Sequence, residues 1–219
     1  MIAGCKCLIF DLDGTLLDAY GNIMDNSNYT LNRLGYPALD METVKQNIGG
    51  GPGDFWKKFV PGDKVDQAMS IYIQRVKDNL FKKTFLLPGV KKVLENFKAG
   101  GVKMAVASNK PGVFSRPLVE YLKIDEYFDM IVCGDEVARM KPDPESLNII
   151  MKKLRVKSLE TIYVGDMGID IDTAHGAGAR CIAVLTGSGS REELALKDPF
   201  LILEDISELP GLILNPVEV

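Results

Sequence analysis

Histidine and cysteine are scarce in this chain of 219 residues, which contains one histidine and four cysteines. His175 has no evident partner with which to form a catalytic pair, so it is a poor candidate for a general base and is interpreted as structural. The cysteines, Cys5, Cys7, Cys133 and Cys181, lie in or beside apolar runs, and their spacing matches no zinc site. We therefore expect buried thiols in a reducing compartment.

A strong charge of either sign is also missing. The chain has 26 basic and 30 acidic residues, a net charge of -4, which excludes a general nucleic-acid binder. No apolar run is long enough to span a bilayer, and the chain enters its first strand without the layout of a signal peptide. With 46% hydrophobic and 26% charged residues, the composition predicts a globular cytoplasmic protein with no nucleic-acid or membrane partner.

The most informative stretch covers residues 7–18, at the start of the chain. An apolar run at residues 7–10 predicts a buried strand, and two acids, Asp11 and Asp13, follow it directly. Gly14 lets the chain turn at that point. Packing gives no reason for two acids at the tip of a buried strand. Their mutual repulsion would be relieved by a bound cation.

Residues 19–87 contain no convincing strand and predict helices interrupted by glycine. Apolar residues at helical spacing favour a helix over residues 63–83 and a shorter one over residues 24–34. Gly49-Gly50-Gly51-Pro52-Gly53 predicts a loop, because this composition suits neither a helix nor a strand. It lacks the Lys-Ser or Lys-Thr pair of a P-loop, so we do not expect it to bind phosphate in that way.

From residue 88 onward, helices and strands alternate. We expect strands at residues 102–107, 130–133, 161–164, 180–185 and 200–203, the last at an edge. The intervening helices are expected at residues 90–99, 111–122 and 144–154, with another reaching about residue 175. Asp143 is the predicted N-cap of the third helix, with Pro144 at its first position.

Such alternation predicts an α/β fold, a doubly wound and mostly parallel sheet with helices on both faces. The α/β core would comprise residues 1–18 and 88–219. Residues 19–87 would form a small inserted helical cap domain. Because this segment leaves the core immediately after the acidic loop, it can lie over that loop as a lid.

Polar residues follow several strands of the predicted core. The carboxyl ends of parallel strands meet at one edge of a sheet, where ligands bind, so these side chains should converge in one crevice. The residues are Asp11, Asp13, Ser108, Asn109, Lys141, Asp166 and Asp170. Each has a simpler interpretation alone, as a helix cap or a solvated charge, and Asp18 and Asp172 are interpreted in that way. Their joint occurrence favours a shared site.

The chemistry that this set indicates is phosphoryl transfer. Asp11, Asp166 and Asp170 offer hard oxygen ligands for Mg²⁺. Ser108 and Asn109 can donate hydrogen bonds to phosphate oxygens. The Lys141 ammonium can balance the negative charge that collects there. One carboxylate can attack phosphorus to form an aspartyl-phosphate, while a second protonates the leaving oxygen and then deprotonates water.

Four short motifs resemble those of the haloacid dehalogenase superfamily of phosphotransferases. They are Asp11-Leu12-Asp13-Gly14-Thr15, Ser108-Asn109, Lys141-Pro142 and Gly165-Asp166-Met167-Gly168-Ile169-Asp170. The resemblance implies a Rossmann-like core and a catalytic set of Asp11 as nucleophile, Asp13 as general acid and base, Ser108 and Lys141. It also implies that Ser108, Asn109 and Lys141 bind the phosphoryl group. The implied Mg²⁺ ligands are Asp11, the main-chain carbonyl of Asp13, Asp166 and Asp170.

Within this superfamily, the acid at Asp13 argues against dehalogenases, which lack it. Residues 108–111 and 134–145 are similar to phosphoglycolate phosphatases and to a related pyrophosphatase group. The second of these stretches also fits relatives of β-phosphoglucomutase. The leading prediction is therefore a Mg²⁺-dependent phosphatase of small phosphate monoesters, phosphoglycolate first. The alternatives are a phosphosugar mutase, a pyrophosphatase or nucleotidase, and a phosphate-binding protein without turnover.

Substrate selection is expected to lie in the cap. Residues 55–83 carry seven basic side chains against three acids, which would suit an anionic leaving group such as glycolate. The alternative is that these are solvated helix faces. The Gly49–Gly53 loop is expected to reach the mouth of the site. We expect a small phosphorylated metabolite as the partner, and a monomer or homodimer.

Overall fold

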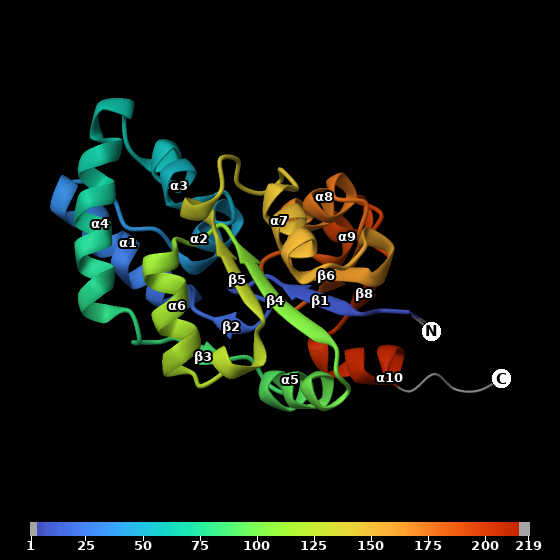
Figure 1. Ribbon diagram of the computed structural model, residues 1–219. Helices are drawn as coiled ribbons and strands as arrows, with labels where there is room; N and C mark the ends of the chain where they lie inside the picture. Colours follow the sequence, from blue (N-terminus) through green and yellow to red (C-terminus); the bar gives the residue numbers. More distant parts are fainter. Residues whose placement is uncertain (1–3, 215–219) are drawn as a thin grey trace.

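A six-stranded parallel sheet forms the centre of the molecule in the computed structural model, which describes residues 4–214 (Figure 1). The strand order is β5-β4-β1-β6-β7-β8, and every neighbouring pair is parallel. The strands are β1 (Cys7–Phe10), β4 (Lys103–Ser108), β5 (Met130–Cys133), β6 (Thr161–Gly165), β7 (Arg180–Val184) and β8 (Leu201–Leu203). The predicted α/β fold is thus confirmed, with β8 at the edge as expected.

The β1 strand shows why this sheet needs helices on both faces. Its four side chains are fully buried, and successive residues point to opposite sides. Leu8 and Phe10 belong to one hydrophobic cluster, and Cys7 and Ile9 belong to another. A strand that is apolar on both faces is stable only when both faces are covered.

The helices of the core cover these two faces. Residues of α5, α6 and α10 join the cluster around Phe10, whereas α7, α8 and α9 pack on the cluster around Ile9. Their bounds are α5 (Val90–Ala99), α6 (Gly112–Tyr121), α7 (Glu145–Leu154), α8 (Gly168–Gly176), α9 (Arg191–Ala195) and α10 (Leu209–Ile213). The α7 helix begins one residue later than predicted, and the Asp143 side chain accepts a hydrogen bond from the Glu145 N–H at 3.0 Å.

Four helices form the segment between β2 and β3, which we call the helical insertion (residues 20–79). They are α1 (Tyr20–Leu34), α2 (Met41–Asn47), α3 (Gly51–Phe59) and α4 (Val65–Asn79). In Figure 1 they group beyond the carboxyl ends of the core strands. Trp56, Phe55 and Leu31 form the centre of their own small core. The division into core and cap domains stays a prediction.

Two expectations for this segment were wrong in part. Phe85–Leu86 forms a short strand, β3, which pairs antiparallel with β2 (Leu17–Asp18) where the chain leaves and re-enters the core. Two residues are too few to show a strand periodicity in the sequence. The predicted loop at residues 49–53 ends early, because α3 already begins at Gly51, with Pro52 in its first turn, where proline is tolerated.

Along residues 4–214, no helix combines the length and the apolar composition that crossing a membrane requires. The cysteines are free thiols, as expected: Cys7, Cys133 and Cys181 are buried, and Cys5 is half-buried. His175 is exposed near the end of α8 and lies outside the lining of the site pocket described below.

Candidate active site

The site begins where β1 ends. Asp11 continues the strand direction, and its N–H donates to the Val164 carbonyl of β6 at 2.9 Å. Gly14 then turns the chain with a φ of 85°, a conformation that side chains with a Cβ atom rarely adopt. A Cβ atom at this position would also collide with the Asp166 carboxylate and the Tyr20 hydroxyl. The predicted role of Gly14 in the turn is confirmed.

Three buried carboxylates meet at the ends of β1 and β6. Asp11, Asp166 and Asp170 each offer one oxygen atom, and these three atoms lie within 4.8 Å of one another. Asp166 and Asp170 are fully buried, and Asp11 is 8% exposed. Carboxylates so close repel one another unless a cation lies among them. The donor set therefore fits Mg²⁺, which prefers oxygen ligands.

Groups from three separate segments fix the Asp166 carboxylate. Its oxygens accept hydrogen bonds from the Thr15 hydroxyl at 3.1 Å, the Tyr20 hydroxyl at 3.2 Å and the Ser188 N–H at 2.9 Å. A Cβ atom at Gly187 would collide with this carboxylate. Side chains behind a ligand set its orientation. None of these three partners was predicted from the sequence, although Thr15 is the last residue of the motif that begins at Asp11.

Lys141 places one positive charge inside the acidic cluster. Its Nζ lies 3.0 Å from Asp11 Oδ1 and 2.6 Å from Asp170 Oδ1. It also donates to the Tyr163 hydroxyl at 2.8 Å, and this hydroxyl contacts Asp170 Oδ1 at 3.0 Å. Tyr163 was missed, because an aromatic residue within an apolar strand resembles ordinary core.

The electrostatics follow from burial and close charges. Burial opposes the charge of Lys141, but Asp11 and Asp170 outweigh it and raise its pKa above the ordinary value. Burial of Asp166, with Asp170 and Asp11 nearby, raises its pKa to about 8. Burial also raises the pKa of Asp170, against the opposing effect of Lys141. Three acids sharing one ammonium thus carry excess negative charge once they ionise.

Asn109 connects the core to the helical insertion. Its amide nitrogen donates to the Gly49 carbonyl at 2.8 Å and to the Lys141 carbonyl at 3.0 Å. Its amide oxygen accepts from the Lys141 N–H at 2.9 Å. The predicted contact of this side chain with phosphate would require one donated bond to break. In the present arrangement Asn109 positions Lys141 and holds the Gly49 loop at the site, where that loop was expected.

Asp13 contacts a second lysine rather than Lys141. Its Oδ2 is 2.6 Å from Lys110 Nζ, and both side chains are mostly buried. Its Oδ1 is buried without a hydrogen-bond partner within residues 4–214. Lys110 was not predicted as a site residue, although it follows Ser108-Asn109 directly. Its ammonium fixes one Asp13 oxygen and leaves the other without a hydrogen bond among residues 4–214.

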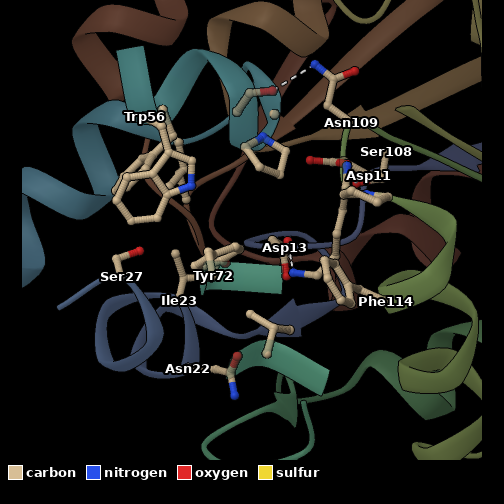
Figure 2. Close-up of a pocket in the computed structure, with 18 of the residues that line it drawn as sticks. Asp11, Asp13, Asn22, Ile23, Ser27, Trp56, Tyr72, Ser108, Asn109 and Phe114 are labelled. Carbon is tan, nitrogen blue, oxygen red and sulfur yellow. Dashed lines mark hydrogen bonds and ion pairs between the residues drawn. The ribbon is translucent and has the colours of Figure 1, made fainter. Parts of the chain in front are cut away.

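The structure brings the predicted residues together. Asp11, Asp13, Ser108, Asn109 and Lys141 line one pocket between the core and the helical insertion (Figure 2). Asp166 and Asp170 contact this group through the acidic cluster. Ser108, the last residue of β4, accepts a long contact of 3.4 Å from the Lys110 N–H. The individual roles of these residues stay predictions.

The raised pKa of Asp166 predicts how metal-free stability depends on pH. The unfolded chain releases this proton near pH 4, whereas the folded protein keeps it until about pH 8. The unfolded state therefore binds fewer protons between these values, and Asp166 lowers the free energy of unfolding as pH rises. Bound Mg²⁺ should remove this penalty, so it should raise Tm by about 5–10 °C more at about pH 8.5 than at pH 6.

Thermal unfolding with excess Mg²⁺ or EDTA at the two pH values measures this difference. Asp166→Asn should abolish most of it, because the amide does not titrate. If Mg²⁺ raised the Tm of the unmodified protein equally at both pH values, the prediction would be contradicted.

Comparisons with known proteins agree with this geometry. Residues 8–184 match the haloacid dehalogenase-like hydrolase family. A phosphoglycolate phosphatase from Nitrosospira multiformis is 30% identical, with 95% of each chain covered. One from Pseudomonas savastanoi pv. phaseolicola is also 30% identical, over 94% of this chain and 79% of the relative. A crystal structure of a predicted phosphoglycolate phosphatase from Haemophilus somnus has a TM-score of 0.91 at 25% identity and covers 97% of this chain and 99% of its own.

The fold and the acidic site at its strand ends thus define a hydrolase of the α/β type. The chain belongs to the haloacid dehalogenase-like hydrolase family.

Proposed function

We propose that the chain is a Mg²⁺-dependent phosphatase that hydrolyses small phosphate monoesters through a phosphorylated Asp11. The observation that carries this proposal is the position of Asp11. Asp11 belongs to the acidic cluster, its Oδ1 lies 3.0 Å from the Lys141 ammonium, and it lines the pocket between the core and the helical insertion. Such a site can hold a metal ion and a phosphoryl group together. The relatives named phosphoglycolate phosphatase support the same activity.

In the first step, an Asp11 carboxylate oxygen attacks phosphorus, and the bond between phosphorus and the leaving oxygen breaks. Asp13 gives its proton to that oxygen, so that an alcohol departs. Its unpartnered Oδ1 is the atom free to do so. Lys141 and Ser108 bind the phosphoryl oxygens, and the Lys141 charge balances the negative charge of the transition state.

In the second step, water attacks the phosphorus of the aspartyl-phosphate. Asp13, now ionised, accepts a proton from this water, and the bond from Asp11 to phosphorus breaks to release phosphate. Asp11, Asp166 and Asp170 would hold Mg²⁺, together with the main-chain carbonyl of Asp13. The metal ion would supply charge neutralisation at the phosphoryl oxygens.

Metal dependence of phosphate release provides the direct test. The substrates are phosphoglycolate, which the relatives suggest, and 4-nitrophenyl phosphate, whose leaving group needs little help. We expect release from at least one of them with Mg²⁺, and a loss of at least about 100-fold in EDTA, since the metal stabilises the transition state. Equal rates in Mg²⁺ and EDTA would contradict the metal role. No release from either ester would contradict the proposed phosphatase.

A further inference from the structure

The pocket over Asp11 extends into the helical insertion, and its far wall should contact the leaving group. Its empty volume, counted together with the open solvent at its mouth, is about 820 Å³. Figure 2 shows Asp11 and Ser108 on one side and Trp56, Ser27 and Ile23 on the opposite side. A phosphoryl group held at Asp11 would therefore direct its alcohol toward Trp56. The chemistry of this wall determines which alcohols fit.

Most of this far wall is apolar. Ile23, Phe55 and Val76 come from the helical insertion, and Phe114 closes the pocket from the core. Asn22 also lines it, but its amide nitrogen donates to the carbonyls of Asn79 and Lys82, and its amide oxygen accepts from Asn26. The wall thus offers a surface for an apolar or aromatic group rather than for a small ion.

The cations of the pocket are already paired. Within residues 4–214, the basic residues that line it are Lys110 and Lys141. Lys110 is bound to Asp13, and Lys141 to Asp11 and Asp170. A carboxylate in the leaving group would therefore lose its hydration without a free cation to replace it, which is costly.

This distribution corrects the expectation of a basic lid facing the substrate. The seven basic residues of positions 55–83 lie outside the pocket lining. Lys57 pairs with Asp54, Lys83 pairs with Asp25, and the Arg75 guanidinium lies over the Tyr29 ring. The excess of basic residues is a property of the outer helix faces, as in the alternative interpretation.

Two buried polar atoms on the wall lack partners. The Trp56 Nε1 and the Ser27 Oγ form no hydrogen bond with any group in residues 4–214, although both side chains are fully buried. An unsatisfied buried donor is unfavourable, and nearly all such groups in native proteins find a partner. Both residues line the pocket, so a small movement of these side chains would let a ligand there supply that partner.

We propose that the leaving group is a neutral, largely apolar alcohol, aromatic or of similar shape, that carries a hydrogen-bond acceptor for Trp56 and Ser27. This inference rests on the proposed phosphatase and names the substrate class for that site. The apolar wall contacts the body of the alcohol, and the indole N–H and the hydroxyl donate to its acceptor. An anionic leaving group such as glycolate matches neither feature.

Three phosphate esters separate these possibilities. 3-Pyridylmethyl phosphate and benzyl phosphate have the same shape and differ by one acceptor nitrogen, whereas phosphoglycolate carries a carboxylate. In the unmodified enzyme, we expect kcat/KM for 3-pyridylmethyl phosphate to exceed that for benzyl phosphate about tenfold, the effect of one net hydrogen bond. For both neutral esters, kcat/KM should be higher than for phosphoglycolate.

Variants assign the preference to the two donors. In Ser27→Ala and Trp56→Phe, the pyridyl-to-benzyl ratio should fall toward one. The ratio is taken within each variant, so a partial loss of folded protein cancels. Ser146→Ala is the matched control, because Ser146 on α7 is also buried with an unpartnered Oγ among the described residues but lies away from the pocket lining. It should keep the ratio of the unmodified enzyme.

The outcomes distinguish a failure of the leaving-group inference from a failure of the proposed phosphatase activity. Phosphoglycolate hydrolysed more efficiently than both neutral esters would overturn the leaving-group inference and leave the phosphatase intact. A pyridyl-to-benzyl ratio that stays unchanged in both Ser27→Ala and Trp56→Phe would also overturn the leaving-group inference and leave the phosphatase intact. If no ester is turned over, the phosphatase proposal fails. In that case the pocket can still be tested by calorimetry, which measures the affinity of each ester for the Asp11→Asn protein with Mg²⁺. Tighter binding of phosphoglycolate than of the two neutral esters would overturn the leaving-group inference.

Discussion

Replacing Asp11 by Asn should reduce phosphate release by at least about 10⁴-fold while the protein stays folded. The amide is a poor nucleophile, so the aspartyl-phosphate cannot form, and losing a catalytic nucleophile costs several orders of magnitude in kcat. Folding should survive, because the substitution is nearly isosteric and removes one of three mutually repelling charges. Steady-state phosphate release and thermal unfolding of the same preparation measure the two effects.

Asp172→Asn is the matched control for that experiment. Asp172 lies on α8, two residues from Asp170, but its carboxylate is exposed and pairs with Lys197 at the surface. The control should keep turnover and Tm close to those of the unmodified protein. If Asp11→Asn retained more than about one per cent of the activity, Asp11 would not be the nucleophile.

Replacing Lys141 by Met should affect both catalysis and stability. Its ammonium is 3% exposed and lies against Asp11 and Asp170. Removing one member of a buried charge pair costs about 3–5 kcal/mol, because the partner charges remain buried. Phosphate release should fall by about 10²- to 10³-fold as well, since a preorganised charge at the transferred phosphoryl group is lost. Urea unfolding and kcat, measured with saturating Mg²⁺, separate the two losses.

Lys197→Met provides the comparison for Lys141→Met. Lys197 pairs with Asp172 at 2.7 Å, but both side chains are well exposed, so the pair contributes about 1 kcal/mol or less. Activity should not change in this variant. Equal free energies of unfolding for the two variants would show that Asp11 and Asp170 do not depend on the Lys141 ammonium to balance their buried charge.

The site divides its tasks between two parts of the chain. The strand ends of the core and the segments that follow them supply every group proposed to act on the phosphoryl group. The helical insertion supplies the wall that the leaving group would contact. Asn109 links the parts, because one side chain bonds to both Gly49 and Lys141. A shift of the Gly49 loop would therefore reach Lys141, the residue proposed to balance the charge of the phosphoryl group.

The sequence alone determined the fold class and predicted which polar residues meet at one edge of the sheet. Both follow from local patterns. Buried strands are apolar runs of fixed length, and polar residues directly after them must collect at one edge of a parallel sheet. For this reason Asp11, Ser108 and Asp166 could be placed in one crevice without coordinates. Each of these predictions required only the neighbours of a residue along the chain.

Tertiary structure alone decided which side chains surround those residues and what the pocket accepts. Tyr163 and Ser188 contact the acids from segments whose sequence indicates nothing unusual. The basic residues of positions 55–83 looked suited to an anion until the fold placed them outside the pocket lining. The sequence could not show that Trp56 and Ser27 both line the pocket with buried polar atoms that lack hydrogen-bond partners among residues 4–214. The physical reason is that helix orientation and packing, which depend on distant residues, decide which face of an element meets the ligand.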